Sequence, residues 1–167
     1  MKIFSIIFIC TLSLFRMPVI AQNAAAPAVL SIKGEVTNPL TLKQEDFSKM
    51  KRIDMRLTDR DNKDHDFSGV DLSDILRQAG APMGPALRGK NMNKYLLVES
   101  KDGYLTVFSL AELDSGFISR TILLVDREDG QPLSASQGPF RIVVPGEKKH
   151  ARWTWGVTTL IVQSARE

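Results

Sequence analysis

The residues of this sequence best suited to chemistry gather near its C-terminus, where basic and aromatic side chains lie close together. Arg141 is followed by His150 and Arg152, and the only two tryptophans, Trp153 and Trp155, stand one residue apart. Guanidinium groups form bidentate hydrogen bonds with anions, and residues i and i+2 of a strand share a face. This pattern predicts a flat aromatic surface beside positive charge, which suits a planar anionic ligand or a partner protein.

Six residues form the candidate cofactor-binding set: Arg141, His150, Arg152, Trp153, Trp155 and Tyr104. Tyr104 joins this set because it follows Asp102-Gly103, although an Asp-Gly pair is also the usual signal of a simple hairpin turn. The alternative for the cluster is a stacked Arg–Trp surface with one buried core tryptophan. If the cluster is a binding site, replacing Arg141 or Arg152 with alanine weakens binding and leaves folding largely intact.

A second polar segment, DRDNKDHD at 59–66, contains four aspartates and His65. It lacks the calcium-loop pattern, because Lys63 and Asp64 stand where that loop needs an oxygen ligand and a glycine. We therefore interpret the segment as a solvated hairpin and predict no metal ligands. No nucleophile stands beside a base, so no catalytic residues are predicted either.

Periodicity indicates an α+β domain that consists mainly of β-strands with a few short helices. Strands are expected at 29–36, 52–58, 95–100, 104–109, 121–126 and 140–144. Thr41 is expected to cap a helix that continues to Met50, and Asp71 a helix at 72–78. After a turn at Pro145-Gly146 and a basic tip containing Lys148 and Lys149, a final strand should carry both tryptophans.

The N-terminus has the pattern of a secretory signal. Lys2 precedes an apolar run that is too short to span a bilayer comfortably, and the small residue Ala21 offers a cleavage site. We expect a signal peptide at 1–21, a flexible start at 22–27 and a single domain at 28–165. The mature protein would be periplasmic or secreted, with no transmembrane segment after cleavage.

The mature chain has little net charge and no thiol. Removal of Lys2 and Arg16 reduces 22 basic residues to 20, against 19 acidic ones. Together with the absence of a long basic stripe containing aromatics, this balance argues against nucleic acid as a partner. The single cysteine, Cys10, lies in the expected signal peptide. The mature domain would therefore have no disulfide and no cysteine metal site.

Five segments in order carry a family resemblance: LSIKGEVTNPLTLKQEDFSKM (30–50), FSGVDLSDILRQAG (67–80), DGYLTVFSLAEL (102–113), TILLVDREDGQPL (121–133) and the GPFRIVVPG stretch with the Trp residues after it. Together they resemble the sulfite-oxidase-type molybdopterin-binding domain family over residues 28–165. The resemblance implies the fold of that family and suggests molybdopterin as a ligand. It also implies that the region of Arg141 to Trp155 lies near the cofactor.

The sequence departs from this family at the metal ligand. In the enzymes of the family a cysteine thiolate binds molybdenum, and the resemblance places it between Arg56 and Ser68, where no cysteine occurs. Thr58 and Asp59 do not replace a soft thiolate. We therefore expect an exported domain that binds a small anionic or pterin-like ligand, or a protein partner, without ordinary molybdenum catalysis. Two alternatives remain open: a molybdopterin-dependent oxidoreductase, or a component of one, with an atypical metal site, and a periplasmic partner of a sensor or transporter.

Overall fold

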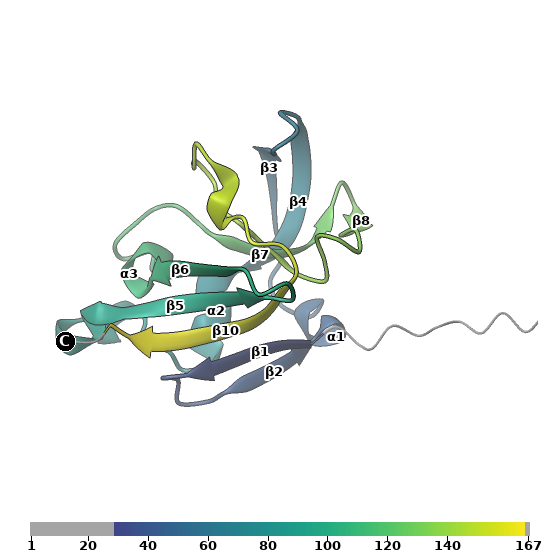
Figure 1. Ribbon diagram of the computed structural model, residues 1–167. Coiled ribbons are helices and arrows are strands. Elements are labelled where there is room, and N and C mark those ends of the chain that lie inside the picture. The colour runs from purple at the N-terminus through teal and green to yellow at the C-terminus, as the bar shows by residue number, and fades with distance from the viewer. Residues whose placement is uncertain (1–28, 166–167) are drawn as a thin grey trace, which may run out of the picture.

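Two β-sheets, each of five strands, form the body of the protein (Figure 1). The computed structural model describes residues 29–165. Within this range no helix is long and apolar enough to cross a membrane. Short helices and turns connect the strands, so the expected α+β domain dominated by strands is confirmed.

The strands are β1 (Val29–Gly34), β2 (Leu40–Lys43), β3 (Ile53–Thr58), β4 (Asp64–Asp71), β5 (Lys94–Ser100), β6 (Leu105–Ser109), β7 (Leu123–Glu128), β8 (Gln131–Pro132), β9 (Arg141–Val143) and β10 (Val157–Ser164). The α-helices are α1 (Gln44–Phe47), α2 (Leu72–Gln78) and α3 (Leu110–Leu113). Three 3₁₀ helices are η1 (Gly84–Ala86), η2 (Gly89–Asn93) and η3 (His150–Arg152).

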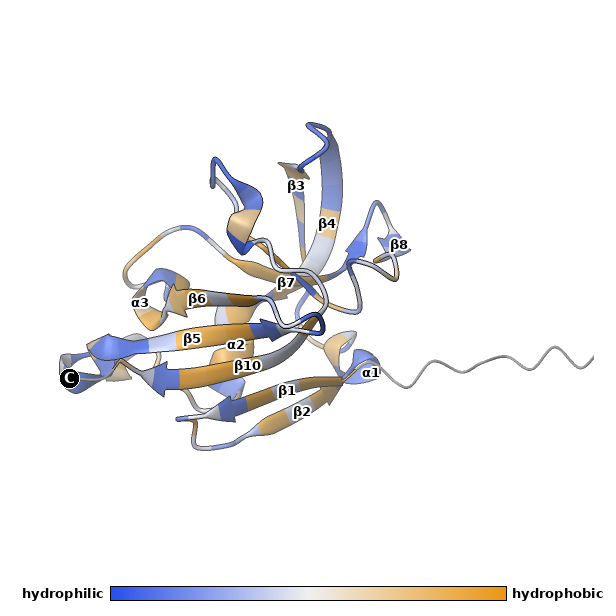
Figure 2. Cartoon of the chain, in the orientation of Figure 1, coloured by the Kyte–Doolittle hydropathy of each residue, from blue (hydrophilic) through white to orange (hydrophobic). Residues whose placement is uncertain are grey.

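The first sheet has the order β2-β1-β10-β5-β6, and β10 runs parallel to β1 and antiparallel to β5. The second sheet has the order β3-β4-β7-β8, with β9 also paired to β7. Alternate residues of the strands enter one shared core, as in β6, where Thr106 and Phe108 are buried between exposed neighbours. Figure 2 shows polar residues gathered instead at the β3–β4 turn and near η3.

Local sequence signals explain several boundaries. The side chain of Asp71 accepts a hydrogen bond from the backbone N–H of Ser73 and caps α2 as expected. Residues 40–43 instead form β2, paired with β1, so the expected helix from Thr41 to Met50 is wrong over its first residues. Pairing with β1 buries Leu42 within the sheet, and α1 begins only at Gln44.

The chain crosses from one sheet to the other between β9 and β10, and this crossing holds the candidate site. The expected strand carrying Trp153 and Trp155 is wrong, because β10 begins only at Val157 and both tryptophans lie in irregular backbone after η3. The N–H of Ile142 donates to Thr154 O (2.9 Å), and that of Val157 donates to Phe140 O (2.8 Å). These bonds fix both ends of the segment against β9.

Candidate functional site

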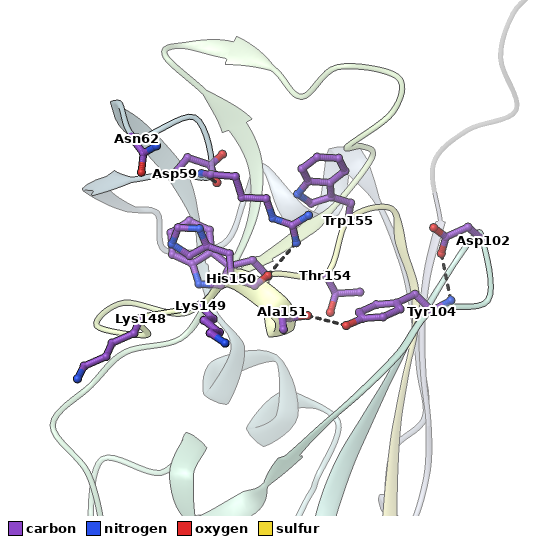
Figure 3. Close-up of a pocket in the computed structure, with 12 residues that line it drawn as sticks. Asp59, Asn62, Asp102, Tyr104, Lys148, Lys149, His150, Ala151, Thr154 and Trp155 are labelled. Carbon is purple, nitrogen blue, oxygen red and sulfur yellow. Dashed lines mark hydrogen bonds between the residues drawn. The ribbon is translucent and has the colours of Figure 1, made fainter.

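A cavity of about 670 Å³ opens at one end of the protein, where three connecting segments meet (Figure 3). These segments are the β3–β4 turn, the β5–β6 turn and the crossing between β9 and β10. The residues that line the cavity are Asp59, Arg60, Asn62, Asp102, Tyr104, Lys148, Lys149, His150, Ala151, Trp153, Thr154 and Trp155. Four of the six residues expected at the site, namely Tyr104, His150, Trp153 and Trp155, are therefore brought together.

An ion pair lies directly behind this cavity. Arg141 is fully buried, and its Nη2 donates to Oδ1 of Asp59 at 2.7 Å. Burial opposes ionisation of Asp59, but the hydrogen bonds from Arg141 and from the backbone N–H of Arg60 outweigh it and lower the pKa of that carboxyl. Arg141 does not line the cavity, which corrects the expectation that it is an exposed ligand contact.

Three aromatic rings enclose the Arg141 guanidinium. Its Cζ lies 5.1 Å from the ring centroid of Phe67 and 5.4 Å from those of Trp153 and Trp155. Such distances give cation–π attraction, which partly compensates a cation for lost water. The Nε and Nη1 atoms of Arg141 and Nε1 of Trp155 are buried without a hydrogen-bond partner among the described residues.

The two tryptophans play different structural roles. Trp153 is buried, and its Nε1 donates to Val144 O at 3.0 Å, so it belongs to the core while one edge reaches the cavity. Trp155 is only partly buried, and two guanidinium groups lie near its ring, with Cζ of Arg60 at 4.7 Å and Cζ of Arg141 at 5.4 Å from its centroid. Trp155 therefore offers the cavity an aromatic surface that already carries cations.

Hydrogen bonds to the backbone of η3 hold the cavity walls. Arg60 Nη2 donates to His150 O at 2.8 Å, and the Tyr104 hydroxyl donates to Ala151 O at 2.9 Å (Figure 3). The His150 ring packs on Trp153 with ring centroids 4.2 Å apart. The tips of two hairpins that are distant in sequence are thus attached to one short helix.

Arg152, which was also expected to bind the cofactor, does not line the cavity. Its guanidinium binds Glu147 and Glu112, and its Cζ lies 4.6 Å from the centroid of the Phe108 ring. Sequence reasoning also missed Asp59 and Arg60 as wall residues. The Arg-Asp alternation at the β3–β4 turn was the signal available, but only the fold shows that this turn faces η3.

A second charged cluster lies where the β3–β4 hairpin meets the β7–β8 turn. Oxygen or nitrogen atoms of His65, Glu128 and Asp129 lie within 4.8 Å of one another. His65 Nδ1 is 2.6 Å from Oδ2 of Asp129, and its Nε2 is 3.2 Å from Oδ2 of Asp61. These contacts with Asp129 and Asp61 raise the pKa of His65 from 6.5 to about 9. The imidazolium is thus itself the cation of this cluster.

The fold agrees with the comparisons to known proteins. The family model of the oxidoreductase molybdopterin binding domain matches residues 17–166, so the chain belongs to this family. Among solved structures the chain is similar to the sulfane dehydrogenase SoxCD from Paracoccus pantotrophus, with a TM-score of 0.64 and 21% identity. The match covers 84% of this chain but only 39% of that one. No curated protein sequence matches the chain.

The residues present do not fit a molybdenum centre with a protein thiolate. Cys10 is the only cysteine, and it lies outside the described residues. Of the two acidic side chains in the cavity wall, Asp59 is already engaged by Arg141, and Asp102 accepts hydrogen bonds from the Ser100 hydroxyl and from the backbone N–H of Tyr104. The organic, anionic part of such a cofactor fits better, because the walls provide the cations Arg60, Lys148 and Lys149 and the aromatic ring of Trp155.

Proposed function

We propose that this domain binds a planar, anionic, pterin-like ligand in the cavity between the β3–β4 turn and η3, without ordinary molybdenum catalysis. The observation that carries the proposal is the composition of the cavity wall, which joins an aromatic ring to several cations and contains no thiolate. Contact with the exposed part of the Trp155 ring would hold the planar part of the ligand. Arg60 and the two lysines of the rim would hold its negative charge.

The local charges support an anion. Three cationic side chains of the wall, Arg60, Lys148 and Lys149, face two carboxylates, Asp59 and Asp102. The charge of Asp59 is compensated by Arg141 behind it. The remaining balance is positive, although the mature chain as a whole is nearly neutral. This contrast attracts an anion to the cavity specifically.

Membership of the oxidoreductase molybdopterin binding family supports a pterin as the planar part. From the expected export signal we also propose that this binding takes place in the periplasm or outside the cell. The alternative, an oxidoreductase with an atypical metal site, draws support from the same family membership. Against it, Oδ1 of Asp59 is already engaged by Arg141, and no cysteine or methionine of the described residues lines the cavity.

Tryptophan fluorescence tests the proposal directly, because both tryptophans of the chain line the cavity. We expect titration of the exported protein with a pterin monophosphate to quench this fluorescence with saturation. The unphosphorylated pterin should bind more weakly. Replacing both Lys148 and Lys149 with glutamine should lower the affinity by about tenfold or more, since a charge-assisted hydrogen bond contributes about 1.5–3 kcal/mol.

Two control variants sharpen this test. Lys33→Gln removes a lysine on β1 that does not line the cavity and should bind as the wild type does. Arg152→Ala should also keep its affinity, because Arg152 binds glutamates outside the cavity. Failure of the wild-type protein to bind either pterin would overturn the proposal and favour a protein partner for this surface.

A further inference from the structure

The outer edge of strand β3 is open. β3 is the last strand of its sheet and pairs only with β4. In the described part of the chain, residues 53–58 make no other backbone hydrogen bond. Its outward N–H and C=O groups are therefore available to another strand.

The edge strands of the first sheet, β6 and β2, are less suited to pairing with another strand than β3 is. At the free edge of β6, the carbonyl of Val107 accepts a hydrogen bond from Arg152 Nη1 at 3.3 Å. β2 has only four residues. β3 has six residues in regular register with β4, without proline or a bulge. It lacks the features that most often prevent strand addition, apart from its charged side chains.

Those charged side chains alternate in sign. Asp54 and Arg56 are exposed on one face of β3. Asp54 makes no ion pair with any residue of the described chain, and Arg56 is 65% exposed and 3.4 Å or more from its carboxylate partners. On the opposite face Ile53, Met55 and Leu57 are half-buried and pack against the core, with their outer parts uncovered.

We propose that β3 pairs with β3 of a second copy of this chain, antiparallel and with the two Met55 residues opposite each other. In this register Asp54 of each copy faces Arg56 of the other copy, so two ion pairs form on the exposed face. On the other face Ile53 meets Leu57 of the second copy, and Met55 meets Met55. Cross-strand pairs of opposite charge and of apolar residues both stabilise a sheet.

Neighbouring registers are less favourable, and this selects one dimer. A shift of one residue to either side of the Met55 centre places Asp54 opposite Asp54, or Arg56 opposite Arg56, across the two-fold axis. Like charges directly opposite each other destabilise a strand pair. The alternating charges of Asp54 and Arg56 therefore disfavour pairing of β3 with unrelated strands but favour pairing with β3 of a second copy in one register.

Pairing at β3 would also affect the cavity. β3 leads directly into the turn that carries Asp59 and Arg60, both in the cavity wall. A neighbouring strand on β3 would hold the β3–β4 hairpin from its second side. Dimerisation would thus further stabilise a part of the cavity wall that is held within the chain by β4, by Arg141 through Asp59, and by the contacts of Arg60 with η3.

Charge exchange in the exported protein tests the dimer by sedimentation equilibrium. The wild-type protein should reach a dimer as its concentration rises. Asp54→Arg alone, or Arg56→Asp alone, should raise the dimer dissociation constant by about tenfold or more, because two attractive pairs become two repulsive ones. The double variant Asp54→Arg/Arg56→Asp restores opposite charges at both places and should dimerise again.

A mixture of the two single variants gives the sharpest result, since each provides the charges that the other lacks. We expect the mixture to form a heterodimer under conditions where each single variant is monomeric. Asp54→Arg breaks no ion pair within the chain, so its thermal unfolding should match that of the wild type at concentrations where both are monomeric. A monomeric wild type at all concentrations, or single variants that dimerise like the wild type, would overturn the proposal.

Discussion

The most unusual residue of this domain is Arg141, a fully buried arginine behind the cavity. It pairs with Asp59 at 2.7 Å and lies among the rings of Phe67, Trp153 and Trp155. Burial of an ion pair removes both partners from water, so the pair adds little net stability. Removal of one partner is nevertheless strongly destabilising, because the other charge stays buried without compensation. Arg141 therefore has a structural role that its sequence context alone did not reveal.

We predict that Arg141→Met destabilises the protein by about 3–5 kcal/mol, because it leaves the Asp59 carboxylate buried without its cation. Urea unfolding followed by circular dichroism measures this loss. The double variant Asp59→Asn/Arg141→Met should be more stable than the single variant, since it removes the uncompensated charge and keeps an acceptor for the N–H of Arg60. A single variant as stable as the wild type would contradict this account of the pair.

Residue type and spacing predicted several residues that line the candidate cavity, but not the geometry of the cavity. Tyr104, His150, Trp153 and Trp155 were recognised from residue type and spacing, and all four line the cavity. The pairing of Arg141 with Asp59 joins residues 82 positions apart, so no local pattern could predict it. The orientation of Arg152 likewise depends on glutamates that the fold brings to it.

Among the elements, the β3–β4 hairpin is the one that connects the two polar clusters. Its turn carries Asp59 and Arg60 of the cavity wall, and just after the turn His65 binds Asp129 of the β7–β8 turn. His65 also approaches Asp61 within the same hairpin. This histidine links two turns of one sheet and helps to fix the hairpin beside the cavity.

The raised pKa of His65, about 9 compared with 6.5, predicts a pH-dependent contribution to stability. Protonated His65 interacts favourably with its partners in the folded protein. Its contribution to stability is therefore fully present below pH 6.5 and is lost as the pH rises through about 9. His65→Gln should therefore lower the free energy of unfolding by about 1 kcal/mol at pH 6, since the partners are half-exposed. The difference from the wild type should vanish above the folded pKa.

Unfolding of both proteins across this pH range checks the effect. Asp129→Asn is the matched variant, because it removes the charge next to His65 while an oxygen remains to accept from the N–H of Asp66. It should reduce the pH dependence without abolishing it, as Asp61 still faces the ring. A constant difference between His65→Gln and the wild type at every pH would exclude an ionic role for His65.

Strands were predicted correctly where the alternation of side chains determines the strand. They were predicted wrongly where contacts with distant segments determine the backbone. The strands at β3, β5 and β6 follow their alternating patterns. Around Trp155 the chain instead turns at Gly156, which has a φ of +60° and bonds to Gln137 O through its N–H. A side chain at Gly156 would also approach Lys101 within 3.0 Å. Gln137 and Lys101, which restrict the backbone here, belong to other segments, so the local sequence could not predict this turn.

At the scale of the whole molecule, the chain has the molybdopterin-binding fold but spans only 39% of the SoxCD chain to which it is similar. Its family and its predominance of strands were both evident from the sequence. The strand orders were not, because pairs such as β1 with β10 join opposite ends of the domain. The shared scaffold does not by itself establish an activity, which must be argued from the cavity.

The central claim is that this scaffold binds a ligand without thiolate-bound molybdenum. Elemental analysis of the exported protein, purified from the cells that naturally make it, combined with pterin analysis of the same sample, tests this claim most directly. We predict no stoichiometric molybdenum, because no cysteine follows Cys10. A pterin without the metal would agree with the proposed cavity. Stoichiometric molybdenum accompanied by redox activity would contradict the account and establish an oxidoreductase with an atypical metal site.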